Sequence, residues 1–227
     1  MQESKIYKYR LKLTKKGALR FISHLDWQNL ILKIFRRCEL NLVLSQGFNK
    51  MPKVSYSPAL PIFLESDCEL VNFQVYNPLN DAFLSNFKKN APLGLEVLSF
   101  VEINNDNEPK SLENYIQWAR YIAKIDEKKT IYNSNELRYI IDKCLNSCEL
   151  LISKKTKKGL EKTINYRNSL KSFEIKDDKV LSFILKTGQN DSIPALRADE
   201  FLKKMFCNTN IFKIKRVEFF DSELRVI

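Results

Sequence analysis

The hydrophobic period of the chain changes between residues 5 and 38, and this change limits the fold most. Residues 5–13 alternate basic and apolar side chains, which predicts a strand with one buried face. Residues 14–22 contain a turn and then extend the strand or lead toward a helix. Apolar residues recur at helical spacing over 27–38. Ser23 is a good N-cap and Asp26 resembles its capping-box partner, so a helix is expected to begin there.

The remainder of the first half continues with short elements separated by turn residues. We expect an extended segment at 41–44, a loop at 45–52, strands at 53–56 and 67–75, a helix at 79–89 and a strand at 95–103. With the first strand and helix, the order is β-α-β-β-α-β. This order is typical of a ferredoxin-like module, here predicted over residues 1–103.

The second half predicts a module of the same kind over residues 111–227, after a polar linker at 104–110. Its expected elements are a strand at 115–125, a helix at 135–145 capped by Asn133 or Ser134, strands at 149–153, 160–166, 170–176 and 179–187, a helix at 198–206 and a strand at 211–220. The two additional strands predict an extra hairpin. The fold class expected for the chain is therefore α+β, with two tandem ferredoxin-like modules.

Composition limits the classes of function. The chain has 227 residues and is 44% hydrophobic, but no apolar run approaches the roughly 18 residues of a membrane span. Its first residues lack an apolar signal region, so we expect a soluble, cytoplasmic protein without a membrane partner. The net charge of +11 favours a polyanionic partner, RNA or DNA, or serves solubility alone.

The five cysteines are an odd number spread over the chain, which does not predict a disulfide framework. Cys144 and Cys148 are four residues apart on an expected helix, yet no third ligand completes a metal or cluster site. We expect buried thiols, no metal and no cofactor. Phosphate-binding loops, dinucleotide glycine fingerprints and nucleophile elbows are also not found in the sequence.

Basic residues gather at two places. The run Lys154, Lys155, Lys157 and Lys158, followed by Arg167, is expected at a hairpin tip, where it is either solvated or binds RNA. In the first strand, Lys8, Arg10 and Lys12 share one face and alternate with tyrosines and leucines. A basic sheet face with aromatic neighbours can hold RNA by phosphate pairing and stacking, whereas the alternative is a solvated outer face.

His24 is the only histidine and is expected at the first position of the helix. A helix N-terminus disfavours imidazolium, so a neutral ring is expected. With Asp26 and Arg20 nearby, His24 could act as an acid or base at a phosphodiester or sugar hydroxyl. The alternative is a local hydrogen bond at the helix end. We assign no catalytic residue, and His24 and Asp26 remain the candidates.

Topology predicts which segment lies near His24, because the second strand of such a module runs parallel to the first. If the second strand is 53–57, the following turn, Ser57–Pro61, is the neighbour. If it is 41–44, the neighbour is the loop Ser45–Asn49. Gln46 and Asn49 of that loop have amides suited to ligand binding.

Several motifs resemble one bacterial family. They are Phe21–Asp26, Phe35–Arg37, Ser45–Asn49, Pro52–Ser55, Pro58–Pro61, Glu65–Ser66 and, less closely, Tyr166–Arg167 and Leu196–Leu202. Together they resemble the radical SAM-linked protein family, a domain of unknown function found beside or fused to B12-binding-type radical SAM proteins. The resemblance implies a radical SAM protein as partner. The family loop commonly reads Pro-His-Pro where this chain has Lys50-Met51-Pro52, so the loop histidine is replaced by Met51. Glu39 and Asn41 also replace its usual Gly and Pro.

Three functions follow as hypotheses. The first is an accessory or substrate-handling protein of a radical SAM system that binds RNA, such as tRNA or rRNA. The second is a metal-independent RNA-processing or RNA-modifying enzyme using His24 and Asp26, and the third is a protein–protein adaptor. The residues expected to bind a ligand or RNA are Arg20, His24, Gln46, Asn49, Lys53, Lys154, Lys155, Lys157, Lys158 and Arg167.

Overall fold

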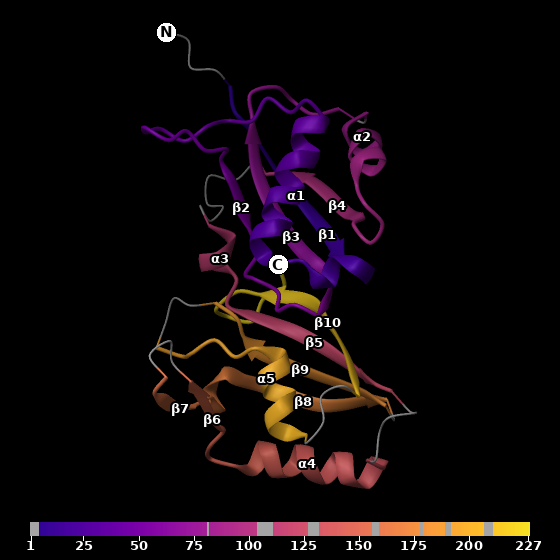
Figure 1. Cartoon of the computed structure of the whole chain (residues 1–227), viewed down its shortest axis with the longest axis vertical. Helices are drawn as coiled ribbons and strands as arrows, with labels where there is room; N and C mark the ends of the chain where they lie inside the picture. The colour runs from indigo at the N-terminus through magenta and orange to yellow at the C-terminus, as the bar shows by residue number, and fades with distance from the viewer. Residues whose placement is uncertain are drawn as a thin grey trace. The chain divides into compact units, whose positions relative to one another are not determined.

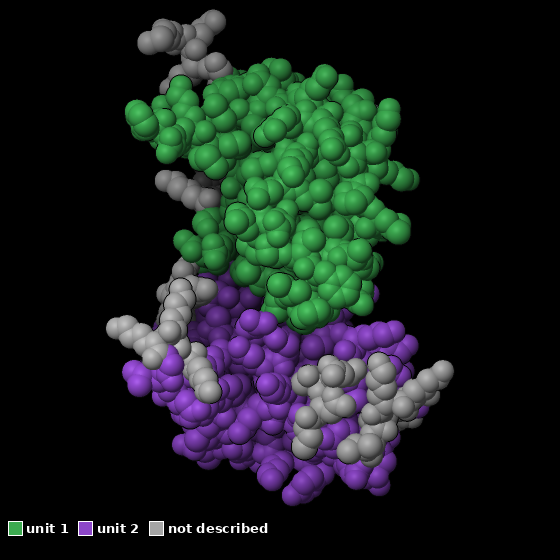
Figure 2. All heavy atoms as spheres, viewed as in Figure 1, with its two compact units in different colours: residues 1–115 green, residues 116–227 purple. Residues whose placement is uncertain are grey.

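The computed structural model is a mixed α+β protein (Figure 1). It describes residues 5–80, 82–103, 111–126, 132–155, 159–177, 179–188, 192–206 and 211–227. The chain divides into two compact units, residues 1–115 (unit 1) and 116–227 (unit 2) (Figure 2). The expected linker at 104–110 lies outside the described residues. In the part of the chain that is described, no helix is long and apolar enough to cross a membrane.

Unit 1 is a sheet with two principal helices. Its elements are β1 (Tyr7–Lys15), η1 (Gly17–Phe21), α1 (His24–Arg37), β2 (Val54–Tyr56), β3 (Glu65–Val75), α2 (Ala82–Asn90), β4 (Val97–Glu102) and α3 (Leu112–Tyr115). The strand order is β4-β1-β3, and β2 pairs with β3. Each of these pairs is antiparallel, so β2 runs parallel to β1.

Two sequence predictions in unit 1 are corrected. Residues after Lys15 do not extend the strand but form the 3₁₀ helix η1, because Gly17 has a left-handed φ of 59° and its N–H donates to Glu65 Oε1 at 3.0 Å. The segment 41–44 forms only isolated bridges, such as Leu42 with Val75, and is not a strand. The second strand of unit 1 is therefore β2.

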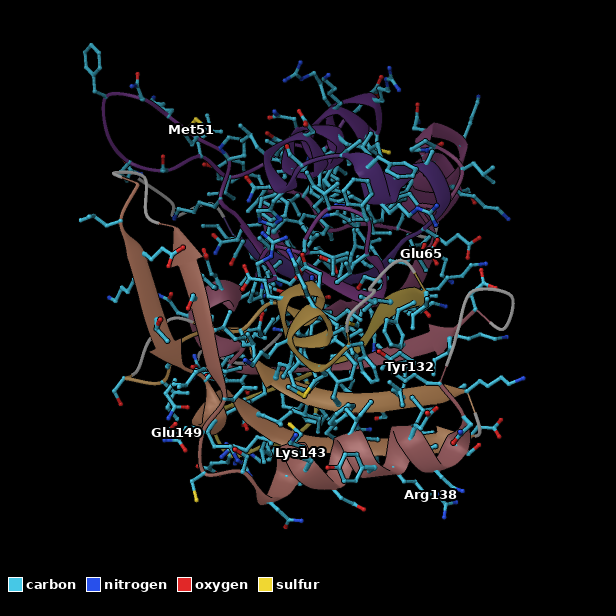
Figure 3. The ribbon with its side chains drawn as sticks, turned by 60° about the horizontal axis from the view of Figure 1, so that its bottom comes forward. Met51, Glu65, Tyr132, Arg138, Lys143 and Glu149 are labelled. Atoms are coloured by element: carbon cyan, nitrogen blue, oxygen red, sulfur yellow. The ribbon has the colours of Figure 1, made fainter. Side chains whose placement is uncertain are left out.

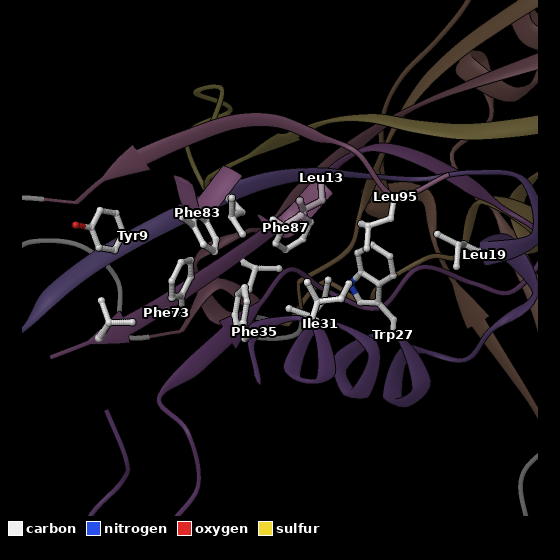
Figure 4. Close-up of a cluster of buried hydrophobic side chains, with 14 residues drawn as sticks. Tyr9, Leu13, Leu19, Trp27, Ile31, Phe35, Phe73, Phe83, Phe87 and Leu95 are labelled. Carbon is white, nitrogen blue, oxygen red and sulfur yellow. The ribbon is translucent and has the colours of Figure 1, made fainter. Parts of the chain in front are cut away.

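The core of unit 1 lies between one face of the sheet and the two principal helices (Figure 4). The helical residues Trp27, Ile31, Ile34, Phe35, Phe83 and Phe87 are buried against Tyr9, Leu11, Leu13, Val71, Phe73 and Val75 of the strands. Because successive strand residues point to opposite faces, Lys8, Arg10 and Lys12 lie on the face without the helices. We call this the open face of unit 1.

Unit 2 contains β5 (Trp118–Ile125), α4 (Ser134–Asn146), β6 (Leu151–Lys155), β7 (Glu161–Asn165), η2 (Arg167–Ser169), β8 (Leu170–Asp177), β9 (Val180–Lys186), α5 (Ala198–Met205) and β10 (Phe212–Phe220). Its sheet has the antiparallel order β10-β5-β9-β8, while β6 and β7 form a separate hairpin. Asn133 caps α4 in a capping box with Glu136, as one of the two predicted caps.

The boundary between the units differs from the prediction. Residues 112–115 were expected in the second module, and Tyr115 was expected to begin its first strand. Instead they form α3 of unit 1, whose Leu112 N–H donates to Ser55 Oγ at 2.8 Å. The first strand of unit 2 begins at Trp118.

The cysteines of α4 also differ from expectation. Cys144 is buried, but Cys148 is exposed. The helix ends at Asn146 with Ser147 as C-cap, so Cys148 is beyond the helix and does not share the buried face with Cys144. Elsewhere, Cys68 is buried and Cys38 is partly buried, while Cys207 lies outside the described residues.

Candidate functional site

Ser23 and Asp26 begin helix α1, as the sequence predicts. Ser23 Oγ accepts a hydrogen bond from the Asp26 N–H at 3.1 Å and donates to Asp26 Oδ2 at 2.7 Å. The first bond satisfies one of the backbone donors that a helix N-terminus leaves without an intrahelical partner. The carboxylate of Asp26 is thus engaged by the capping hydroxyl and also adds a negative charge at the positive end of the helix.

Replacing Ser23 by alanine is expected to lower the free energy of unfolding of unit 1 by about 1 kcal/mol, because the cap acceptor is lost. Denaturant unfolding, followed by Trp27 fluorescence in a Trp118→Phe chain, measures this change. Ser85→Ala is the control, since Ser85 is exposed inside helix α2 and alanine is favourable there. Equal loss in both variants would contradict the capping role.

His24 lies one residue after the cap and contacts two polar neighbours. Gln28 Nε2 donates to His24 Nε2 at 2.9 Å, so the ring accepts at this nitrogen. The two residues are four apart on the helix, the spacing at which side chains meet. The ring of Tyr56 stands edge-on to His24, with centroids 6.4 Å apart and an interplanar angle of 83°.

Tyr56 connects β2 to helix α1. Its hydroxyl donates to the Gln28 carbonyl oxygen at 3.4 Å. Burial raises the pKa of the Tyr56 phenol well above its ordinary value, because the phenolate is disfavoured away from water. Tyr56 therefore remains a hydrogen-bond donor throughout the neutral pH range.

A groove of about 500 Å³ opens beside these residues, and we call it the His24 groove. Helix α1, strand β2 with the two residues around Met51 before it, and the start of α3 line it. Its polar groups are those of His24, Gln28, Asn29, Ser55, Tyr56, Ser111 and Glu113. The hydrogen bond from Leu112 to Ser55 holds α3 against β2, so the groove has a wall on each side.

Met51 also lines the groove. Figure 3 shows Met51 on the loop that precedes β2. Ser45 closes this loop, since its N–H donates to the Met51 carbonyl at 2.7 Å and its Oγ accepts from the Met51 N–H at 3.0 Å. Gln46 and Asn49, the amides expected to bind a ligand, are exposed in the same loop and are not part of the groove lining.

The other residues predicted near His24 have structural contacts. Ser57, in the turn after β2, is buried and donates to Glu69 Oε2 at 3.1 Å. Arg20 lies 3.7 Å from Glu65 Oε1 and stacks over the Phe21 ring, which supports η1. Lys53 is exposed just before β2 and does not line the groove.

In unit 2, two of the predicted RNA-binding cations also have contacts within the fold. Lys154 Nζ lies 2.6 Å from Glu200 Oε2 and over the Tyr166 ring. Arg167 donates to the carbonyls of Ser147 and Leu145 at 2.9 and 3.0 Å, which satisfies carbonyls at the C-terminal end of α4. Lys157, Lys158 and the side chain of Lys155 lie outside the described residues.

The groove residues that sequence reasoning missed are Gln28, Asn29, Tyr56 and Glu113. Gln28 could have been found, because it is four residues after His24 on the same helix. Glu113 could not, since 57 residues separate Leu112 from Ser55, the contact that brings α3 to the groove.

Comparison with known proteins places the chain in a family. The model of an uncharacterized protein conserved in bacteria (DUF2344) matches residues 8–195, which is most of the 227 residues. No curated protein matches the chain. The matched range contains every element that lines the His24 groove. The chain therefore belongs to the DUF2344 family of bacterial proteins.

Proposed function

We propose that this chain is an RNA-binding, substrate-handling accessory protein of a radical SAM system. The RNA part of the proposal comes from the open face of unit 1, and the radical SAM part comes from the resemblance of the sequence motifs. The protein itself supplies no redox group in this proposal. An RNA substrate such as tRNA or rRNA would place it in the cytoplasm.

The observation that carries the proposal is the placement of three cations on the open face. Lys8, Arg10 and Lys12 pair with Gln74, Asn72 and Leu70 of β3. Paired residues share a face of the sheet, so the surroundings of the cations on β3 are neutral. Two acidic residues of the neighbouring strands, Glu69 and Glu102, pair with Leu13 and Tyr9 and therefore belong to the helix-covered face.

The aromatic residues of β1 do not support stacking on this face. Tyr9 is buried in the core, where its ring stacks on Phe100 with centroids 5.1 Å apart, and Tyr7 packs at the edge of the same cluster. The period of two that gathers the cations on one face also moves the tyrosines to the other. Phosphate pairing rather than base stacking is therefore the expected contribution of the open face.

We also propose that both units are ferredoxin-like modules. The sheet orders support this, because the first and third strands of the β-α-β-β-α-β order form the central pair in each unit. In unit 2 these strands are β5 and β9, and β6 and β7 are the extra hairpin between the first helix and β8.

The His24 groove supports a substrate-handling role. Met51 occupies the position at which the resembling family commonly has histidine, and this position lines the same groove as His24. Two motifs that lie far apart in the sequence thus meet at one cavity. The RNA-processing alternative has less support, because Asp26 is two residues from His24, a spacing that does not bring side chains together on a helix.

RNA binding by the purified full chain at increasing salt tests the proposal. With three phosphate contacts, the logarithm of the affinity for single-stranded RNA should fall against the logarithm of salt concentration with a slope of at least about 2. Fluorescence anisotropy of a labelled RNA measures it. No RNA binding at low salt would contradict the proposal. Retention of a radical SAM protein without RNA would favour the adaptor hypothesis instead.

The enzyme hypothesis is separated by His24→Ala. If the chain turns over RNA, this variant should lose turnover and keep most of its RNA binding. If the chain only handles substrate, no turnover is expected from either form, and the product of an RNA incubation remains at full length in both.

A further inference from the structure

The His24 groove differs in chemistry from the open face. Its described lining includes one carboxylate, that of Glu113, and no Lys or Arg. Phosphate groups bind mainly to Lys, Arg and backbone N–H groups, so this lining does not fit a phosphate. Amides, hydroxyls, an imidazole and a carboxylate instead match the donors and acceptors on the edge of a nucleobase.

One row of paired residues leads from the open face to the groove. Arg10 pairs with Asn72, and Asn72 pairs with Ser55, so the three residues cross β1, β3 and β2 in line. Arg10 Nε donates to Asn72 Oδ1 at 2.8 Å. Ser55, the last residue of the row, lines the groove. A strand of RNA whose phosphates lie on the cations can therefore extend along this row to the groove.

We propose that the His24 groove holds one nucleobase that carries an exocyclic amino group, cytosine or adenine, from an RNA strand bound on the open face. This inference rests on the proposed function. The perpendicular rings of His24 and Tyr56 form a corner of the site, and the exposed amide of Asn29 offers a donor and an acceptor. The groove volume of about 500 Å³ leaves room for a base.

Glu113 gives the site its preference. A carboxylate only accepts hydrogen bonds, so it binds the amino N–H of cytosine or adenine. Uracil presents a carbonyl oxygen where cytosine presents the amino group. Two acceptors would then face each other, which costs affinity because neither group supplies a proton.

Oligocytidylate and oligouridylate of equal length, on the order of ten nucleotides, test this preference with equal phosphate charge. The full chain is expected to bind oligocytidylate about tenfold more tightly, a typical gain from correct base contacts. Glu113→Gln should reduce this ratio to near one, because the amide can donate to the uracil carbonyl. Anisotropy titrations at several salt concentrations measure both affinities and their salt slopes.

Two further variants isolate the groove. Asn29→Leu keeps the size of the side chain, removes its hydrogen bonds and should weaken oligocytidylate binding without changing the salt slope. Asn86→Leu is the matched control, since Asn86 is an exposed asparagine on α2 and away from the groove. Thermal unfolding of each variant shows whether the fold is kept, and both Glu113 and Asn29 are exposed.

The outcomes distinguish this inference from the proposed function. If both oligonucleotides bind equally and with salt dependence in the parent chain, the base site is wrong and RNA binding on the open face stands. If Glu113→Gln strengthens both equally, the carboxylate only repels phosphate, and the base site is also wrong. If neither oligonucleotide binds at low salt, the proposed function fails as well.

Discussion

Phe35→Ala is expected to lower the free energy of unfolding of unit 1 by about 3–5 kcal/mol, the usual cost of removing a buried aromatic side chain. Phe35 is 0% exposed. Its ring lies 4.6 Å from the Phe73 ring and 6.4 Å from the Phe87 ring, measured between centroids. Alanine would leave a cavity where α1, β3 and α2 meet, because a closely packed core relaxes only partly around it.

The same substitution at an exposed position is the control. Phe48, on the loop before β2, has a relative exposure of 104% and no core to leave. Phe48→Ala is expected to change the free energy of unfolding by less than about 0.5 kcal/mol. Denaturant unfolding of the Trp118→Phe chain, with Trp27 as the reporter, compares the two variants. A small effect of Phe35→Ala would mean that the cluster in Figure 4 does not carry the stability of unit 1.

Replacing Lys8, Arg10 and Lys12 together by glutamine is expected to weaken RNA binding about a hundredfold at about 0.1 M salt. Each phosphate contact contributes about 0.7 to the salt slope for single strands, so losing three contacts lowers the slope by about 2. Over the decade of salt between about 0.1 and 1 M, a slope of 2 corresponds to the hundredfold change. Anisotropy titrations across this range measure the slope and the affinity.

A second triple variant controls for net charge. Lys33, Arg36 and Arg37 are exposed on helix α1, so their replacement by glutamine removes the same charge from another surface. This control should change the salt slope much less than the β1 variant. If both triple variants weaken RNA binding equally, the binding follows net charge and the open face is not the RNA site. Circular dichroism checks that the β1 variant keeps its sheet, because Arg10 also bonds to Asn72.

Much of the fold could be predicted from local patterns. The alternation in residues 5–13 predicts β1, and the helical spacing with Ser23 as cap predicts α1, because both patterns express which face of a single element is buried. The same reasoning succeeds at Asn133, whose capping box is written in four consecutive residues. It fails at Gly17, where one left-handed residue stops the strand and starts η1.

The candidate site was predictable only in part. His24 could be selected because it is the single histidine and follows a helix cap. The arrangement of its neighbours depends on β2 and α3, which meet His24 only after the sheet forms. Gln46 and Asn49 have suitable side chains, but the bonds of Ser45 to Met51 leave them on an exposed loop.

The sequence by itself determined the order of strands and helices, the helix caps and the separation of cations from apolar residues along β1. These follow from contacts within one element, where residue spacing alone decides which side chains share a face. Tertiary structure alone decided which charges are buried. Lys15 has a basic side chain in an expected turn, yet it is 1% exposed, donates to the Ile22 carbonyl at 3.1 Å and lies over the Trp27 ring. Tertiary structure likewise decided that Glu113 and His24 share one groove, because spacing along the chain carries no record of which distant residues come together.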